Sequence, residues 1–136
     1  MHTIDANIFL EVELGQERSE ECEKLLDAVA QGKMQAVISD FHVDSIIIVM
    51  ESHGIDHETI RKFLVSLTKY SGLQVYYSSL DDRIKATNYM RDHKLDFDDA
   101  FCVQCAIANQ STIISFDRDF DKVSNVKRLE PKDLLT

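Results

Sequence analysis

Four aspartates from three distant parts of the chain have the residue type that a metal-binding group requires: Asp5, Asp99, Asp117 and Asp119. Carboxylates that gather without a cation repel one another, and some of them must then take up protons. A hard divalent ion such as Mg²⁺ or Mn²⁺ prefers oxygen ligands and removes that repulsion. Water bound to the ion loses a proton more readily, and the ion can neutralise charge that builds on a phosphate. The four acids therefore predict a divalent-metal site suited to phosphodiester hydrolysis.

The predicted strands and helices explain why these acids should meet. Short apolar runs predict strands at residues 2–4, 36–38, 73–77, 112–116 and 126–129. Helical spacing of apolar residues predicts helices at residues 8–14, 19–31, 41–52, 56–70, 81–93, 98–109 and 131–135. The helix at 41–52 contains a β-branched run, so a strand stays open there.

This alternation predicts a three-layer α/β/α sandwich with a central, mainly parallel sheet of four to five strands. Ligands of such sheets bind at the carboxyl ends of the strands. Asp5 directly follows the first predicted strand, Asp117 follows the fourth, and Asp99 lies in the first turn of a helix. The topology therefore predicts that the acids meet at one edge of the sheet.

Composition limits the classes of function. The 136 residues fit one domain spanning 1–136, and 44% are hydrophobic, which is typical of a globular chain. The formal net charge is −9. A protein that holds nucleic acid by bulk charge is usually basic, so this charge argues against that mode of binding. Cations bound to the acidic cluster would remove the objection to a polyanionic substrate.

The cysteines and the apolar stretches indicate a cytoplasmic protein. An odd number of cysteines, Cys22, Cys102 and Cys105, does not suggest a disulfide framework. The C-x-x-C pair lies in an apolar helical stretch, which favours buried hydrophobes over a redox or zinc pair. The sequence shows neither a signal peptide nor a run long enough to span a bilayer, so we expect no membrane association.

Three segments resemble the motifs of the PIN domain family, a group of metal-dependent ribonucleases that includes toxins of toxin–antitoxin pairs. Residues 4–9 (IDANIF) are similar to the opening D-x-N motif, and residues 96–101 (DFDDAF) are similar to an acidic helix start. Residues 114–120 (ISFDRDF) are similar to the closing [TS]-x-D-x-D-F motif. Their order and spacing match the family over nearly the whole chain.

The resemblance implies a role for each matching residue. Asp5, Asp99 and Asp117 would bind the metal, and Asp119 would assist them as a fourth catalytic acid. Asn7 and Ser115 would orient these carboxylates by hydrogen bonds.

One position departs from the family pattern. The family usually places a glutamate early in the helix after the second strand, and that position is Ser45 here. Asp44 is a candidate replacement metal ligand, although adjacent helix positions point about 100° apart. Glu51 is a weaker candidate, nearly two turns further along. The departure leaves the metal affinity and the activity open.

Several of these side chains also have a purely structural interpretation. Asp5 could cap the following helix, and capping is the favoured interpretation for Asp40. Asp96 and Asp98 suit a helix N-terminus, where negative charge is stabilised. His42 is near the predicted site and is a weaker candidate for a substrate contact.

The sequence therefore favours a Mg²⁺- or Mn²⁺-dependent endoribonuclease with RNA as substrate. The resemblance implies either a toxin, with an antitoxin protein as partner and a homodimeric state, or an RNA-processing nuclease. A catalytically weakened PIN-like protein that binds RNA or serves as a scaffold is the main alternative. A phosphatase or receiver-type domain is a third hypothesis, for which Lys127 or Lys132 would be the companion lysine.

Overall fold

The computed structural model describes residues 1–135 and has a five-stranded parallel sheet at its centre. The strand order is β3-β2-β1-β4-β5, so the first strand lies in the middle. The strands are β1 (His2–Ile4), β2 (Ala36–Ser39), β3 (Leu73–Tyr76), β4 (Thr112–Ile114) and β5 (Arg128–Leu129). Ile4 pairs with Ile114 in the register, so the residues that follow β1 and β4 begin side by side.

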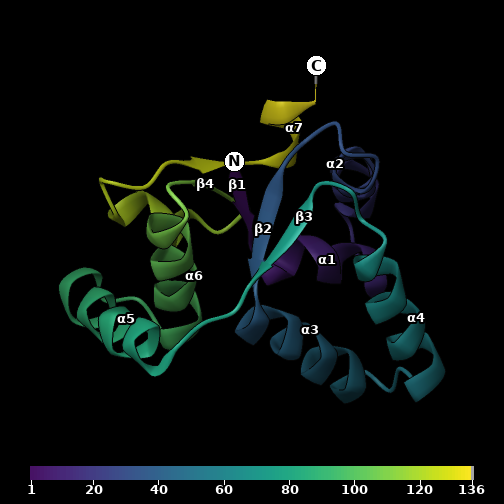
Figure 1. Ribbon diagram of the computed structural model, residues 1–136, viewed down its shortest axis with the longest axis horizontal. Helices are drawn as coiled ribbons and strands as arrows, with labels where there is room; N and C mark the ends of the chain where they lie inside the picture. Colours follow the sequence, from purple (N-terminus) through teal and green to yellow (C-terminus); the bar gives the residue numbers. More distant parts are fainter. Residues whose placement is uncertain (136) are drawn as a thin grey trace.

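Helices cover both faces of this sheet (Figure 1). One side carries α1 (Ala6–Glu13), α2 (Ser19–Ala30), α3 (Asp40–Ser52) and α4 (His57–Thr68), and the other carries α5 (Leu80–His93) and α6 (Phe97–Ala108). The 3₁₀ helix η1 (Arg118–Lys122) follows β4, and α7 (Pro131–Leu134) ends the described chain. The predicted three-layer α/β/α sandwich with a parallel sheet is therefore confirmed.

Two apolar clusters hold the layers together. Phe9 and Met50 belong to the cluster that joins α1, α2 and α3 to the sheet. Phe101, Ile113 and Phe120 belong to the cluster that joins α5, α6 and η1 to β4. Strands buried on both faces are nearly continuous in apolar residues, which explains the apolar runs in the sequence.

The helix predicted at residues 41–52 is a helix, and it begins one residue earlier. Ser39 caps it, because its hydroxyl oxygen accepts the main-chain N–H of His42 at 3.0 Å. Ile46 is buried while Ile48 is exposed, so the β-branched run follows helical spacing rather than strand alternation.

Three strands are shorter than predicted, and the third, which ends at Tyr76, is shorter by one residue. The fourth ends at Ile114, because the amide of Asp117 donates to the hydroxyl of Ser115 and the chain turns there. The fifth comprises only Arg128 and Leu129. No helix among residues 1–135 is long and apolar enough to cross a membrane.

Candidate metal centre

Three aspartates offer carboxylate oxygens that all lie within 4.8 Å of one another: Asp99, Asp117 and Asp119. Asp99 belongs to the first turn of α6, whereas Asp117 and Asp119 lie at the start of η1. Each acid therefore comes from a segment at the carboxyl edge of the sheet, as the topology predicts. Hard oxygen donors in this number suit Mg²⁺ or Mn²⁺ by their chemistry.

Asp99 is the most strongly perturbed member of the group. It is 9% exposed, and burial raises its pKa to about 8, with neighbouring acids adding to the shift. These neighbours are, in decreasing order of effect, Asp96, Asp117, Asp5 and Asp98. Its main-chain N–H donates to the Asp96 carboxylate at 2.9 Å, so Asp96 caps α6 as predicted. A cation among these acids would offset both the burial of the Asp99 carboxylate and the repulsion from its neighbours, and would favour its ionised form.

Asp117 and Asp119 are joined through the backbone. The N–H of Asp119 donates to Oδ1 of Asp117 at 2.9 Å, which fixes the turn between them. Asp119 is exposed, and Lys122 Nζ lies 3.5 Å from its Oδ1. The outer side of the group is therefore open to solvent, and the Asp99 side is buried.

Asp5, a predicted metal ligand, is not one of these three clustered acids among the described residues; it is 3% exposed, and its charge adds to the raised pKa of Asp99. Its Oδ2 accepts the hydroxyl of Ser115 at 2.6 Å. Burial raises the pKa of Asp5, while the Ser115 hydroxyl, His42 and the main-chain N–H of Asn7 act in the opposite direction. Asp5 occupies the N-cap position of α1, and its main-chain oxygen accepts the N–H of Ile8 at 3.0 Å, but its carboxylate makes no side-chain capping hydrogen bond.

Ser115 links this buried acid to the exposed ones. Its oxygen donates to Asp5 and accepts the N–H of Asp117 at 3.0 Å. Asn7, by contrast, is exposed, and its side chain makes no hydrogen bond within the described residues. The predicted orienting role of Asn7 therefore has no side-chain contact behind it and stays a prediction.

His42 is 1% exposed, which leaves no surface for the substrate contact considered from the sequence. Its Nδ1 lies 2.7 Å from the Ser39 hydroxyl, and its Nε2 lies 3.0 Å from Asp98 Oδ1. Asp98 is therefore more than a charge at a helix N-terminus, because it joins α6 to the first turn of α3.

Asp40 does not cap α3, so that expectation is wrong, and Ser39 does so instead. The Asp40 carboxylate accepts the Ser78 hydroxyl at 2.6 Å and the Ser78 N–H at 3.2 Å. Asp40 thereby ties the start of α3 to the segment that follows β3.

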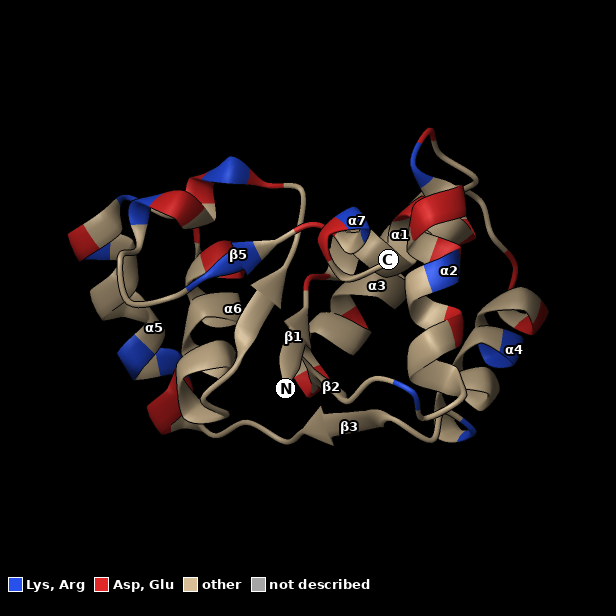
Figure 2. Cartoon of the chain, turned by 90° about the horizontal axis from the view of Figure 1, so that it is seen from above, with Lys and Arg blue, Asp and Glu red and all other residues tan. Residues whose placement is uncertain are grey.

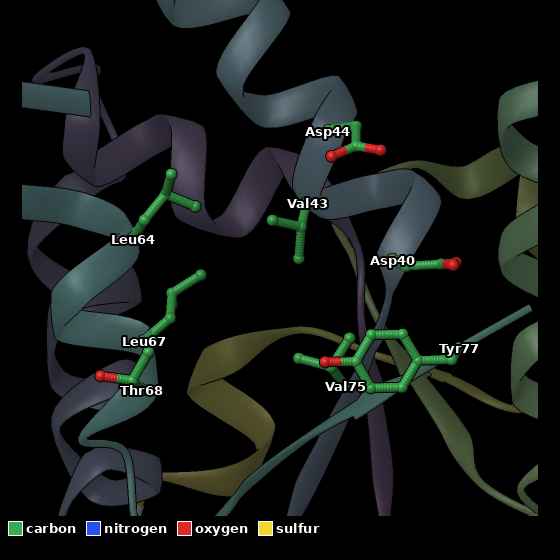
Figure 3. Close-up of a pocket in the computed structure, with 8 residues that line it drawn as sticks. All are labelled: Asp40, Val43, Asp44, Leu64, Leu67, Thr68, Val75 and Tyr77. Atoms are coloured by element: carbon green, nitrogen blue, oxygen red, sulfur yellow. The ribbon is translucent and has the colours of Figure 1, made fainter. Parts of the chain in front are cut away.

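Asp44 lies outside the group of three acids within the described chain. It is exposed on α3 and lines a hollow of about 320 Å³ between α3 and α4. Figure 3 shows Asp44 beside Val43, across the hollow from Leu64 and Leu67. Its part in metal binding therefore stays a prediction, as does that of Glu51, which is also exposed.

Sequence reasoning missed Arg128, a residue of β5. Its guanidinium donates to the main-chain oxygen of Ser115 at 3.0 Å and pairs with Asp121 and Glu130.

Lys127, considered for a receiver-type site, instead lines a hollow with His2 and Thr112, at the strand ends opposite Asp5. This position does not suit the companion lysine of a receiver-type site.

Solved structures of similar fold extend over nearly the whole chain. A toxin–antitoxin complex from Klebsiella pneumoniae is 17% identical, with a TM-score of 0.72, and the match covers 96% of this chain and 98% of that chain. VapBC2 from Rickettsia felis, bound to a promoter DNA fragment, is 13% identical, with a TM-score of 0.73 and coverage of 95% and 97%. VapC20 from Mycobacterium tuberculosis, a sarcin-ricin loop cleaving toxin, is 13% identical, with a TM-score of 0.74 and coverage of 91% and 95%.

At these identities the likenesses establish the fold. No curated protein matches the chain. The family model of the PIN domain matches residues 3–126, which include all three motif segments and the whole acidic group. The chain therefore belongs to the PIN domain family.

Proposed function

We propose that this protein is a Mg²⁺- or Mn²⁺-dependent endoribonuclease, acting as the toxin of a toxin–antitoxin pair through one PIN-like domain over residues 1–136. The observation that carries the proposal is the convergence of Asp99, Asp117 and Asp119 to within 4.8 Å. Clustered acids repel one another, and a divalent cation between them would offset this repulsion.

Each acid would have a distinct part. Asp99, Asp117 and Asp119 would hold the ion, and Asp5, braced by Ser115, would supply a further buried negative charge behind them. A bound divalent ion would supply a water of lowered pKa and neutralise charge on the scissile phosphate. The exposed side of Asp119 leaves the outer face of the site open to a substrate. Asp44 is kept as a candidate additional ligand.

The proposed substrate and partners rest on the comparisons with known proteins. Family membership favours RNA, and the solved relatives described as toxin–antitoxin complexes favour an antitoxin partner. We further propose a homodimer in the cytoplasm.

Acidic and basic segments are interspersed over the helices in Figure 2, so substrate binding would depend on the metal site rather than on a basic face.

RNA cleavage with and without Mn²⁺ tests this function. The wild-type protein should cleave RNA with Mn²⁺ and stop when EDTA removes the ion. Asp99→Asn should lose more than about 100-fold in rate, since loss of a residue outside the ligand set already costs about 10- to 100-fold. Asp27→Asn is the matched control, because Asp27 is exposed on α2 and outside the acidic group. Equal rates for wild type and Asp99→Asn would refute the proposal.

The absence of the family glutamate at Ser45, together with the exposed position of Asp44, favours a second candidate. This is a catalytically weakened protein that keeps RNA binding or a scaffold role. Mn²⁺-independent RNA binding without cleavage would support it.

A further inference from the structure

Arg128 is a partly covered cation that contacts residues on both sides of Asp117 and Asp119 in the sequence, and its side chain is only 12% exposed. It lies on β5, with three partners arranged around its planar guanidinium. Nη1 donates to the Ser115 carbonyl and to Glu130 Oε2, each at 3.0 Å. Nε and Nη2 reach the two carboxylate oxygens of Asp121 at 3.0 and 3.4 Å.

Two of these partners mark the ends of the segment that supplies two of the clustered acids. Ser115 lies two residues before Asp117, and Asp121 lies two residues after Asp119. One planar guanidinium therefore contacts both ends of residues 115–121. A guanidinium suits this task because its donors form a fixed fork, whereas an ammonium is a point charge.

A second arginine covers the same segment from outside. The guanidinium carbon of Arg18 lies 4.2 Å from the centre of the Phe116 ring. Arg18 Nη1 is also 3.9 Å from Glu130, the acid that Arg128 contacts. Glu130 is held in turn, because its N–H donates to Asp133 at 2.9 Å. Of the partners of Arg128, Glu130 is thus anchored to the start of α7.

We propose that Arg128 is a positioning residue, which holds residues 115–121 in the shape that lets Asp117 and Asp119 share a cation with Asp99. This inference rests on the metal binding of the proposed function, but not on its RNA substrate. The hydrogen bonds of Arg128 and its positive charge predict opposite changes in metal affinity when the side chain is replaced. A nearby positive charge repels a divalent ion, so loss of that charge alone would tighten metal binding. Loss of the clamp would weaken it.

Titration calorimetry of Mn²⁺ into the full chain separates these effects. Arg128→Met removes both the clamp and the charge, and Arg128→Lys keeps the charge without the fork. The control is Arg118→Met, because Arg118 is exposed between Asp117 and Asp119 and its side chain makes no hydrogen bond or ion pair in the described chain. Each variant is measured below its own unfolding temperature, as found by circular dichroism.

We expect Arg128→Met to bind Mn²⁺ about 10-fold more weakly than wild type, as is usual for partners that orient ligands. Arg128→Lys should resemble it despite the retained charge, and this variant decides the question if Arg128→Met does not fold. Arg118→Met should bind as tightly as wild type or more tightly. Affinity in Arg128→Lys equal to that of wild type would overturn the inference.

The same samples separate this inference from the proposed function. Wild type that binds Mn²⁺ but cleaves no RNA would refute the nuclease and leave the positioning role standing. Wild type that binds no Mn²⁺ would overturn both.

Discussion

The hydroxyl of Ser115 bridges Asp5 and the amide of Asp117, at 2.6 and 3.0 Å. The bridge joins a buried carboxylate that follows β1 to the main chain of an acid that follows β4. Asp5 and Ser115 are 110 positions apart in the sequence. Because β1 and β4 are paired in parallel, a single oxygen can set the orientation of both segments.

Ser115→Ala should therefore lower both stability and metal-dependent activity. Asp5 would lose a hydrogen bond in a buried position, and leaving a buried polar group unpaired costs about 1–3 kcal/mol. Activity should fall about 10- to 100-fold, since the carboxylates lose their orientation. Urea denaturation and RNA cleavage with Mn²⁺ measure the two effects. Ser124→Ala, at an exposed position, is the control and should change neither.

Metal affinity should depend on pH through Asp99. Its pKa of about 8 means that the metal-free protein keeps this proton at neutral pH, and a bound cation must displace it. The apparent affinity for Mn²⁺ should therefore increase from pH 6 to pH 8 and level off above about pH 8. Calorimetry in buffers of different ionisation enthalpy should detect proton release at pH 7. An affinity that does not change over this range would contradict the assignment of Asp99 as a ligand.

The raised pKa of Asp99 also affects the stability of the metal-free protein, but in the opposite direction: metal affinity increases with pH, whereas this stability decreases. The unfolded chain releases the Asp99 proton near pH 4, whereas the folded chain keeps it until about pH 8. The favourable contribution of the protonated form is thus complete below pH 4 and is lost as the pH rises to about 8. Asp99→Asn removes this loss, because an amide carries no charge.

Asp99→Asn should consequently stabilise the metal-free protein at pH 8 while removing Mn²⁺ binding. A gain of about 1 kcal/mol corresponds to an increase in Tm of about 3–5 °C for a chain of this size. Thermal unfolding with EDTA and with Mn²⁺ measures both effects: Mn²⁺ should raise the Tm of wild type alone. A variant that is less stable than wild type in EDTA would show that the Asp99 carboxylate is part of a favourable structural contact instead.

The acids of the site were predictable because their positions follow from local patterns. An aspartate directly after a short apolar run, or in the first turn of an apolar helix, lies at the carboxyl edge of a parallel sheet whatever the loops do. Asp5, Asp99 and Asp117 could therefore be placed from the sequence. The register of β1 on β4 then brings Ser115 to Asp5.

The partners of these acids were not predictable in the same way. Arg128 reaches Ser115 across 13 positions, and His42 reaches Asp98 across 56. Neither pair has a spacing that a helix or a strand repeats, so only the packing of separate elements brings them together. The side of α3 on which Asp44 lies was also hard to predict. Adjacent residues of a helix point about 100° apart, so a shift of one position moves a carboxylate to another side of the helix.

His42 provides a last test of how the site is held in place. Its ring joins Ser39 at the end of β2 to Asp98, the neighbour of Asp99, and it packs against Phe41 and Phe101. His42→Leu keeps an apolar contact in that space and removes both polar ones, so the start of α6 loses its tie to the sheet. We expect a loss of about 1–3 kcal/mol in the free energy of unfolding and a lower Mn²⁺ affinity. His42→Gln can still donate a hydrogen bond to Asp98. It should therefore recover part of the Mn²⁺ affinity, even if it recovers little of the free energy of unfolding. Equal Mn²⁺ affinity in both variants and in wild type would show that α6 holds Asp99 in place without His42.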